Sequence, residues 1–337
     1  MARYRPSLAF VFFSLLLVHG ACFGADLTIS VIDVGHGDAI LVQFPNGQEM
    51  LVDAGEKAAG SRVVAYLQQA QVKDIELLVA THPDKDHIGG MPAVLGSGIP
   101  VAKAWISGYQ PATPTGTQRA FDAALRQQAT AQTPVAGEHM CFGAATVTVV
   151  APLALCSFPD VNDNSVVLMV SYGNTSALLA GDMEQKERAS VPCWQATNVL
   201  KVAHHGSENG TDLPFVRALR PKFAVISDDR PAGHGSAPVR GLLRSAGVRC
   251  YSTATSGTIV LTSDGTTQFL CKTLGRAATP TTTAGFEPAG ALDQVFVTAS
   301  GTRYHRAGCR YLSAPRTATT KAQAAAKGYT PCKACMQ

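Results

Sequence analysis

The sequence predicts an α/β domain followed by a small, separate module. From Leu27 to Cys271, short apolar strands alternate with segments whose apolar residues recur at spacings of three and four, the pattern of amphipathic helices. Of the 337 residues, 46% are hydrophobic and 15% are charged, which excludes a disordered or fibrous chain. Residues 272–293 lose the pattern and fill with Thr, Ala, Gly and Pro, so we expect a linker there, before a module at 294–337.

The expected strands and helices follow one another in an order that suits a layered domain. Each strand is a run of aliphatic and β-branched residues bounded by turn-forming residues, as Asn164 and Gly173 bound the run SVVLMVSY. Each helix carries an apolar stripe. The expected strands are residues 27–33, 38–44, 49–53, 75–81, 165–172, 176–182, 198–204, 223–227 and 257–263. The expected helices are Arg62–Gln71, Gly89–Leu95, Gln118–Ala129, Leu213–Leu219 and Val239–Ala246.

Residues 1–25 have the pattern of a signal peptide. Two arginines precede an apolar run from Leu8 to Val18, and small residues follow. The run is about 11 residues long, too short for a bilayer, which needs roughly 20. We therefore expect an exported protein, periplasmic or secreted, with no transmembrane segment in the mature chain. Lipid attachment at Cys22 is the alternative, which His19 disfavours because such a site calls for an aliphatic residue there.

The run THPDKDHIGG at residues 81–90 predicts a metal site. It follows the apolar run IELLVA and places four metal-binding side chains within six residues. Burying several carboxylates and imidazoles without partners is costly, and a cation removes that cost. Imidazole nitrogen and carboxylate oxygen together suit zinc or manganese, with magnesium as a third option. A solvated acidic turn is the alternative. The four expected ligands are His82, Asp84, Asp86 and His87.

Three later segments supply further candidates, each after an apolar strand. Asp182 ends SALLAGD and is a candidate bridge between two cations, or alternatively the N-cap of the segment from Glu184. His204 and His205 follow LKVA, where a pair of histidines is a poor element of a core. His234 lies in the glycine-rich loop AGHGSAPV, where a solvated histidine is the alternative. The sequence therefore indicates one site assembled from several strand ends.

These residues carry a resemblance that covers residues 26–265. In order, the chain contains DVGHGDAILV, LVDAG, THPDKDHIGG, NDNSVVL, LLAGD, LKVAHHGS and a GHG loop. This set resembles the metallo-β-lactamase superfamily, and within it the subgroup related to the C-terminal hydrolase domain of the DNA-uptake competence protein ComEC. The resemblance implies an αββα sandwich with one or two divalent metals at the edge between its sheets. It implies ligand roles for His82, Asp84, Asp86, His87, Asp182, His204 and His205.

Three departures from the family pattern affect the expected site. Asp84 stands where the superfamily usually has histidine, which shifts the metal preference from zinc toward manganese or magnesium. The usual third-motif histidine has no evident counterpart, so Asp163 or Asn164 is a candidate substitute, and a weak or water-filled metal position is the alternative. His36 replaces a glutamine that is usual in the subgroup, and we expect it near the cleft. The residues expected to support the ligands are Asp33, Asp38, Asp53 and Asn164.

The expected chemistry is hydrolysis. Two neighbouring cations would lower the pKa of a bound water and stabilise the oxygens of a phosphate ester. Asp86 would help to hold the cluster, and Lys201 or His234 would stabilise charge. Whichever of His204 and His205 does not bind metal would protonate the leaving group. The leading hypothesis is an exported phosphodiesterase or nuclease. The alternatives are a hydrolase of small esters, lactones or β-lactams, and a nucleic-acid or cell-wall binding protein with a structural metal domain.

The C-terminal module, residues 294–337, is basic. It holds seven Lys and Arg and no acidic residue, whereas residues 26–271 hold 17 basic and 22 acidic ones. Clustered cations attract phosphates, so we expect the module to contact nucleic acid or another phosphodiester substrate. An ordinary soluble surface is the alternative.

Four residues of this module, His305, Cys309, Cys332 and Cys335, have the spacing of a structural zinc site. One metal would stabilise a module too small to fold on a core alone. The segment resembles short modules at the ends of some secreted nucleases and, distantly, the metal-binding domain of the DNA-repair protein Ada. A disulfide is the alternative, favoured by an oxidising compartment.

Five cysteines remain in the first domain, and we expect structural roles for them. Cys141 with Cys156, and Cys250 with Cys271, lie near enough in sequence to bridge neighbouring strands. This pairing would leave Cys193 free.

Overall fold

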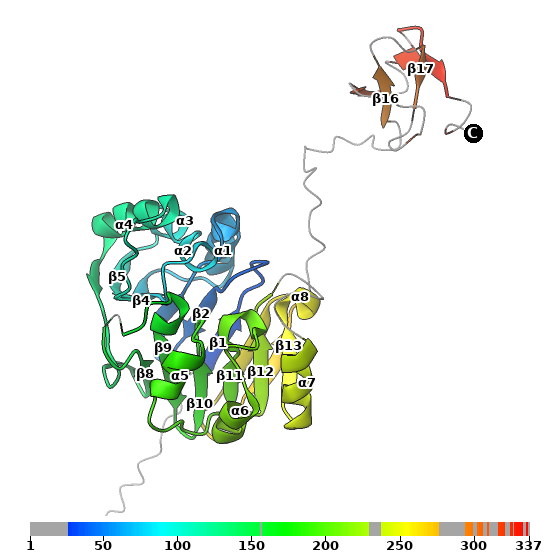
Figure 1. Cartoon of the computed structure of the whole chain (residues 1–337). Helices are drawn as coiled ribbons and strands as arrows, with labels where there is room; N and C mark the ends of the chain where they lie inside the picture. Colours follow the sequence, from blue (N-terminus) through cyan, green and yellow to red (C-terminus); the bar gives the residue numbers. More distant parts are fainter. Residues whose placement is uncertain are drawn as a thin grey trace, which may run out of the picture. The chain divides into compact units, whose positions relative to one another are not determined.

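The computed structural model describes residues 26–155, 157–228 and 237–275, and in the C-terminal region 294–298, 302–305, 309, 316–320, 324–325, 327–332 and 335. The chain divides into two compact units, residues 1–277 and 278–337 (Figure 1), and each is described by itself. The expected signal peptide with Cys22, the thiol of Cys156, the loop with His234 and residues 276–293 of the expected linker lie outside the described residues.

Sheet A has eight strands in the order β15-β14-β1-β2-β3-β4-β5-β6. Neighbouring strands from β3 to β6 are parallel, and the others are antiparallel. The strands β3 and β4 therefore end at the same edge of the sheet. The bounds are β1 Leu27–Val31, β2 Ile40–Gln43, β3 Glu49–Val52, β4 Ile75–Ala80, β5 Val101–Ile106, β6 Thr130–Gln132, β14 Ile259–Ser263 and β15 Leu270–Thr273.

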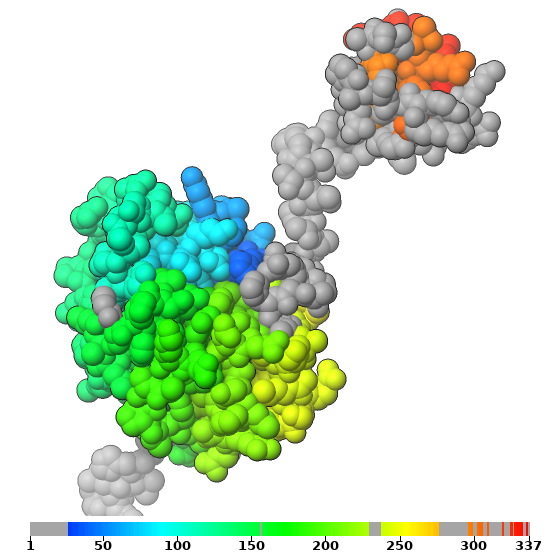
Figure 2. Space-filling view, in the orientation of Figure 1, coloured from blue at the N-terminus to red at the C-terminus, as the bar shows by residue number. Residues whose placement is uncertain are grey.

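Sheet B has seven strands in the order β13-β12-β11-β10-β9-β8-β7. The strands β10 to β13 are parallel, so they too end at one edge. The bounds are β7 His139–Phe142, β8 Ala145–Ala151, β9 Val167–Tyr172, β10 Thr175–Leu179, β11 Val199–Lys201, β12 Phe223–Ile226 and β13 Arg249–Ser252. Figure 2 shows the earlier, blue to cyan part of the unit adjoining the later, green to yellow part.

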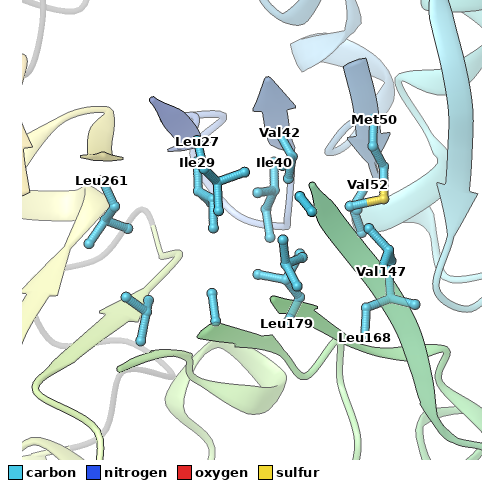
Figure 3. Packing of buried hydrophobic residues seen from close by; sticks show 14 of the residues in the cluster. Leu27, Ile29, Ile40, Val42, Met50, Val52, Val147, Leu168, Leu179 and Leu261 are labelled. Carbon is cyan, nitrogen blue, oxygen red and sulfur yellow. The ribbon is translucent and has the colours of Figure 1, made fainter. Parts of the chain in front are cut away.

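Three buried clusters show that the unit has four layers. The first cluster fills the space between the two sheets (Figure 3), with Leu27, Ile40 and Met50 of sheet A facing Val147, Leu168 and Leu179 of sheet B. The second lies between sheet A and α1–α4, and the third between sheet B and the helices α6 and α7. The α-helices are α1 Gly60–Gln69, α2 Lys85–Ile88, α3 Met91–Leu95, α4 Gly116–Gln128, α5 Gln185–Ser190, α6 Leu213–Leu219, α7 Ala237–Ser245 and α8 Thr253–Ser256. The αββα sandwich expected from the resemblance is confirmed.

Every strand and helix expected from the sequence has a counterpart in this unit, but six strands were not foreseen. They lie toward the sheet edges: β5, β6 and β15 in sheet A, and β7, β8 and β13 in sheet B. Strands near an edge are partly exposed and mix polar with apolar residues, as the alternating burial along β8 shows, so their apolar signal is weaker. None of the helices in the described ranges is long and apolar enough to cross a membrane.

The expected disulfide between Cys250 and Cys271 is wrong, since both thiols are free. Cys250 packs against the cluster between sheet B and its helices, whereas Cys271 packs against the cluster between the sheets. Successive side chains of a strand point to opposite faces, so the residue of β13 that faces Cys271 is Tyr251. Cys141 and Cys193 are also free and exposed.

The C-terminal unit is small and built from two pairs of strands. β16 (Gln294–Thr298) pairs antiparallel with β18 (Arg316–Thr320), and β17 (Arg303–Tyr304) pairs parallel with β19 (Thr330–Pro331). A bridge between Phe296 and His305 joins the pairs. The buried apolar cluster among its described residues consists of Val297 and Ala324, with Tyr304 and Tyr329 partly buried against them.

Candidate metal centre

The expected ligands meet where parallel strands end. In sheet A, β3 leads to Asp53 and β4 leads to the segment 81–90. In sheet B, β10 leads to Asp182 and β11 leads to His204 and His205. Parallel neighbours end at one edge of their sheet, and the face-to-face packing of the two sheets brings these edges together. Segments far apart in the chain thus converge on one place.

Two glycines let the loops at this edge touch. A Cβ atom on Gly37 would overlap the carbonyl oxygen of Asp86, and one on Gly90 would overlap the carbonyl oxygen of Ala54. Gly37 also has a φ of +109°, which side chains rarely adopt. Beside it, the amide of Asp38 donates to the Asp86 carbonyl at 3.2 Å. Close backbone contact therefore fixes the position of α2, which carries Asp86.

Four ligand atoms surround a common point deep in the site. Asp182 Oδ2 lies 3.2 Å from His87 Nε2 and 3.3 Å from His205 Nε2. Asp86 Oδ2 lies 3.2 Å from His205 Nε2, and the four ligand atoms are all within 4.8 Å of one another. Tetrahedral metal bonds of about 2.1 Å place neighbouring ligand atoms about 3.4 Å apart. The spacing therefore fits one divalent cation.

A second set of donors lies somewhat farther from Asp182. Its Oδ2 atom is 3.8 Å from His82 Nε2 and 3.9 Å from His204 Nε2, and His82 Nε2 is 3.6 Å from Asp84 Oδ2. His82 Nε2 and Asp182 Oδ1 are buried without a hydrogen-bond partner. Native structures rarely leave buried polar atoms unpaired, so these two atoms fit a second cation. Asp182 is near members of both donor sets, as a bridging carboxylate would be.

Asp53 orients both histidines of the first motif. Its Oδ2 atom lies 2.7 Å from His87 Nδ1 and accepts the hydroxyl proton of Thr81 at 2.6 Å. The Thr81 oxygen is 3.1 Å from His82 Nδ1. A carboxylate only accepts, so His87 donates from Nδ1, and Thr81, whose proton goes to Asp53, accepts from His82 Nδ1. Both rings thus present the lone pair of Nε2 to the centre.

Glu184 and a backbone carbonyl orient the second histidine pair. His204 Nδ1 donates to Glu184 Oε1 at 2.8 Å, and His205 Nδ1 donates to the carbonyl of Ser227 at 3.0 Å. The two histidines have φ values of 46° and 51°, in the left-handed region. Each such residue costs about 1–3 kcal/mol and persists where the surrounding structure fixes it. In this conformation both histidines, and not one alone, face Asp182.

The buried carboxylates of the site stabilise positive charge on the neighbouring histidines. Burial opposes protonation of His87 and His205. Asp182 opposes this effect, together with Asp53 at His87 and with Asp38 and Asp86 at His205, and these carboxylates raise the pKa of both histidines well above the usual value. Burial also opposes ionisation of Asp182, but His205 and His87 hold its pKa well below the usual range. Without metal, protons on the imidazoles balance the carboxylates, and a divalent cation would displace these protons.

The expected role of Lys201 in stabilising substrate charge is wrong. Its side chain is 1% exposed, and Nζ lies 2.8 Å from Asp38 Oδ2 and donates to the Val202 carbonyl at 2.9 Å. Asp38 lies in turn 3.5 Å from His205 Nδ1. Burial raises the pKa of Asp38, but Lys201 together with His205 and His87 outweighs it, and the pKa lies well below the usual range. Lys201 therefore supports His205 through Asp38, because its ammonium group is buried and already engaged.

The NDNS segment does not replace a histidine ligand. The Asn164 amide donates to the carbonyls of Phe158 at 2.8 Å and Asp160 at 2.6 Å, and its oxygen accepts from the Phe158 amide at 3.3 Å. Asp163 accepts the Glu187 amide at 3.0 Å. Both side chains are used in holding their own loop against α5, so the expectation that one of them completes the metal site is corrected. The second donor set instead contains His204.

Sequence reasoning did not assign roles to His36 and Glu184. His36 Nε2 lies 3.2 Å from Asp86 Oδ2, in a loop shaped by Asp33, whose Oδ1 accepts the Gly35 amide at 3.2 Å. Asp33 thus supports the loop and not a ligand directly. The available signals were the glycines on both sides of His36 and the position of Glu184 two residues after Asp182.

The four candidate ligands of the C-terminal unit also meet. His305 Nδ1 lies 3.3 Å from Cys309 Sγ, which lies 4.0 Å from Cys332 Sγ, and Cys335 joins them within 4.8 Å. A disulfide bond is about 2.05 Å long. Two thiolates bound to one zinc at about 2.3 Å lie about 3.8 Å apart. The spacing favours a shared metal over a disulfide.

Comparison with known proteins agrees with this architecture. Residues 32–119 match the family described as the metallo-beta-lactamase superfamily. The crystal structure of the metallo-beta-lactamase fold protein YhfI from Bacillus subtilis aligns with 71% of this chain and 100% of its own, at a TM-score of 0.50 and 13% identity. The chain therefore has the metallo-β-lactamase fold. This fold implies divalent metal ions, and the two donor sets around Asp182 are able to hold them.

The chain is also similar in sequence to curated competence proteins. It is 28% identical to ComE operon protein 3 of Bacillus subtilis (strain 168), over 71% of this chain and 33% of that protein. It is 29% identical to Recombination protein 2 of Haemophilus influenzae, over 60% and 24%, and 27% identical to Competence protein ComA of Neisseria gonorrhoeae, over 69% and 32%. The chain thus spans about a quarter to a third of the length of these relatives. These matches confirm the ComEC-type resemblance.

Proposed function

We propose that this protein is a metal-dependent phosphodiesterase with nucleic acid as its substrate class. The proposal rests on the position of Asp182, whose Oδ2 is near two donor sets, with two histidines at 3.2–3.3 Å and two at 3.8–3.9 Å. A pair of divalent positions suits a substrate with charged oxygens on both sides of the bond that breaks. Asp84 and Asp86 add hard oxygen donors, which favour manganese or magnesium. The names of the relatives, competence and recombination proteins, support a nucleic-acid substrate.

The exposure of the donors indicates the side from which substrate reaches the centre. When bound, two divalent cations would supply a water of lowered pKa and positive charge for phosphate oxygens. The side chains of His82 and His87 are fully buried, whereas Asp84 is 46% and His204 is 22% exposed. Substrate therefore meets the side of the centre that Asp84 and His204 line. The buried residues hold the ligand geometry and exclude water from behind.

The test compares three substrates with full-length protein stripped of metal and reloaded with Mn²⁺, Mg²⁺ or Zn²⁺. We expect cleavage of bis-p-nitrophenyl phosphate and single-stranded DNA with Mn²⁺, and no turnover of a chromogenic β-lactam. The Asp182→Asn variant, prepared in the same way, controls for contaminating nuclease. Turnover of the β-lactam alone would contradict the proposal and favour a small-molecule hydrolase. No turnover of any of the three substrates would favour the alternative of a nucleic-acid or cell-wall binding protein with a structural metal domain.

We also propose that the C-terminal unit holds structural zinc and contacts polyanions. The ligand spacing supports the metal, and the sequence of this module, which holds the basic residues Arg303, Arg316 and Lys327, contains no acidic residue. Replacing these three residues by Gln should reduce the salt dependence of DNA binding. The slope of the logarithm of the binding constant against the logarithm of the salt concentration should become less steep by about 0.9 for each phosphate that the protein no longer neutralises. The matched control replaces the exposed Lys57, Lys103 and Lys222 of the first unit by Gln. Equal slopes for both triple variants would contradict the proposal.

Export is a further part of the proposal, and it is supported by the sequence of residues 1–25. Mass spectrometry of the N-terminal peptide from the periplasm or medium tests it. We expect a mature chain that begins after Gly24. A chain that keeps Met1 or carries lipid at Cys22 would contradict this expectation.

A further inference from the structure

Three of the four ligands around the first metal position, His87, His205 and Asp182, form hydrogen bonds to residues that would not bind the metal. Asp53 holds His87, the Ser227 carbonyl holds His205, and the amide of Asp182 donates to Ser165 Oγ at 3.2 Å. Such outer partners set the orientation of a ligand and thereby its affinity for the metal. Asp86, the remaining ligand of this set, is held by none of these three groups.

His36 is in place to hold Asp86. Its Nε2 atom lies 3.2 Å from Asp86 Oδ2, and its ring lies 4.8 Å from the His205 ring between centroids. The Asp86 side chain is 14% exposed, so water alone could reach and reorient it if no side chain held it. The His36 side chain is 26% exposed, so it contacts this carboxylate and solvent at the same time.

The backbone around His36 fixes this contact. Gly37 lies against the Asp86 carbonyl so closely that a Cβ atom would overlap it. The next amide, that of Asp38, donates to the same carbonyl at 3.2 Å. On the other side, Asp33 closes the turn to Gly35. The loop is therefore attached to Asp86 by its main chain, and His36 has little freedom to lie elsewhere.

We propose that His36 is a positioning residue that fixes the carboxylate of Asp86 for a cation shared with His87 and His205. A carboxylate can bind a metal with one lone pair and accept a hydrogen bond with another, so Nε2–H of His36 restricts Asp86 to the rotamer that faces the centre. The inference rests on the metal-dependent part of the proposed function and not on its substrate. A side chain that keeps an amide donor at this position should keep the contact.

The test measures Mn²⁺ affinity, because the thiolate-rich C-terminal cluster disfavours Mn²⁺. Metal-stripped full-length protein is titrated with Mn²⁺, and the free ion is followed by electron paramagnetic resonance. We expect His36→Leu to weaken one Mn²⁺ site by about 10–100-fold, and His36→Gln to stay within about threefold of the parent. His139→Leu makes the same chemical change at an exposed histidine of β7 and should leave the affinity unchanged.

Two results would overturn the proposal. One is a His36→Leu protein with the parent's Mn²⁺ affinity, and the other is a His36→Gln protein as weak as His36→Leu. Thermal unfolding of the metal-free variants checks that each is folded, and His36→Asn, whose amide is too short to reach Asp86, replaces His36→Leu if that variant does not fold. A parent protein that binds Mn²⁺ but cleaves no phosphodiester contradicts the proposed substrate and leaves this comparison intact.

Discussion

The two metal-capable clusters of this protein are built in opposite ways. In the first unit, the donors follow strands of two sheets, and three buried clusters pack the layers that carry those strands. In the C-terminal unit, four donors share a unit whose described apolar cluster is Val297 and Ala324 with two partly buried tyrosines. The first fold can hold its ligands before metal arrives. The described residues of the second provide too little apolar core to do so, so we expect metal binding there to supply the free energy of folding.

The partners of the donors show the same difference. In the first unit, Asp53, Glu184 and the Ser227 carbonyl hold histidine rings, so the ligand geometry is fixed by residues that would not touch the metal. In the C-terminal unit, His305 Nδ1 lies 3.3 Å from the Cys309 sulfur, so this ring nitrogen contacts another donor and not an outer partner. The comparison predicts that metal removal has different consequences for the two units.

The largest expected effect is the response to chelation. Removing metal should unfold the C-terminal unit, since structural zinc in small modules contributes on the order of 10 kcal/mol, and leave the first unit folded. Both tryptophans of the chain, Trp105 and Trp194, lie in the first unit, so their fluorescence reports that unit alone. Hydrogen exchange of peptides from 294–337 reports the other.

A Cys332→Ser, Cys335→Ser variant is the control for this experiment, because it should exchange like chelated protein at any metal concentration. If residues 294–337 remained protected from hydrogen exchange after chelation, metal-dependent folding of the C-terminal unit would be contradicted and a disulfide would be favoured. Loss of tryptophan signal at the same chelator concentration would show that the first unit also depends on metal for its fold.

Asp182→Asn should produce the next largest effect, on activity and not on folding. The bridging carboxylate would be lost from both donor sets, and several kcal/mol of metal-assisted stabilisation corresponds to a loss of kcat/KM of about 10³-fold. The fold should persist because the amide fills the same space. Kinetics on bis-p-nitrophenyl phosphate, with circular dichroism as the check of folding, measure both. Full activity in this variant would remove Asp182 from the centre.

Lys201→Met should destabilise the first unit by about 3–5 kcal/mol, because it leaves the Asp38 carboxylate buried without its partner. Urea unfolding followed by tryptophan fluorescence measures the loss. The double variant Asp38→Leu, Lys201→Met removes both charges and should recover most of it. If Lys201→Met kept the parent's stability and lost only turnover, Lys201 would act on substrate after all.

The smallest expected effect is a pH dependence from Glu187. Burial raises the pKa of this carboxyl group well above its usual 4.5, although the Ser165 amide donates to it at 3.2 Å. The folded pKa exceeds the unfolded one, so the stabilising contribution of Glu187 is complete below pH 4.5 and is lost as pH rises through the folded pKa. Glu187→Gln should therefore gain stability relative to the parent as pH rises. Midpoints of urea unfolding across pH test this, and a constant difference would contradict it.

The sequence predicted which segments meet at the site better than it predicted the direction and burial of individual side chains. Asp182 and the histidine pair could be found because a charged or imidazole group directly after an apolar strand is a poor core element. The position of Lys201 was visible too, but its partner Asp38 comes from the other sheet, so its burial could not be inferred. The Cys250–Cys271 disulfide failed for a similar reason, since one residue of shift reverses the face of a strand.

The partner residues were harder to foresee than the ligands. Glu184 and His36 act through single contacts whose geometry depends on how loops from different strands pack. Asn164 was expected near the metal, yet its amide is saturated by carbonyls only four and six residues away. Short polar side chains often bond to their own loop, and a sequence pattern does not distinguish that use from coordination of a metal.

The left-handed backbone at His204 and His205 affects which substitutions we expect to accumulate there during evolution. Glycine adopts such a conformation without steric cost, so His204→Gly would relieve strain and favour the fold while removing a donor. Selection for a stable fold and selection for a metal-binding site thus act in opposite directions at this position. In a lineage released from the need for hydrolysis, we expect glycine to appear at this turn before the sheets that frame it change.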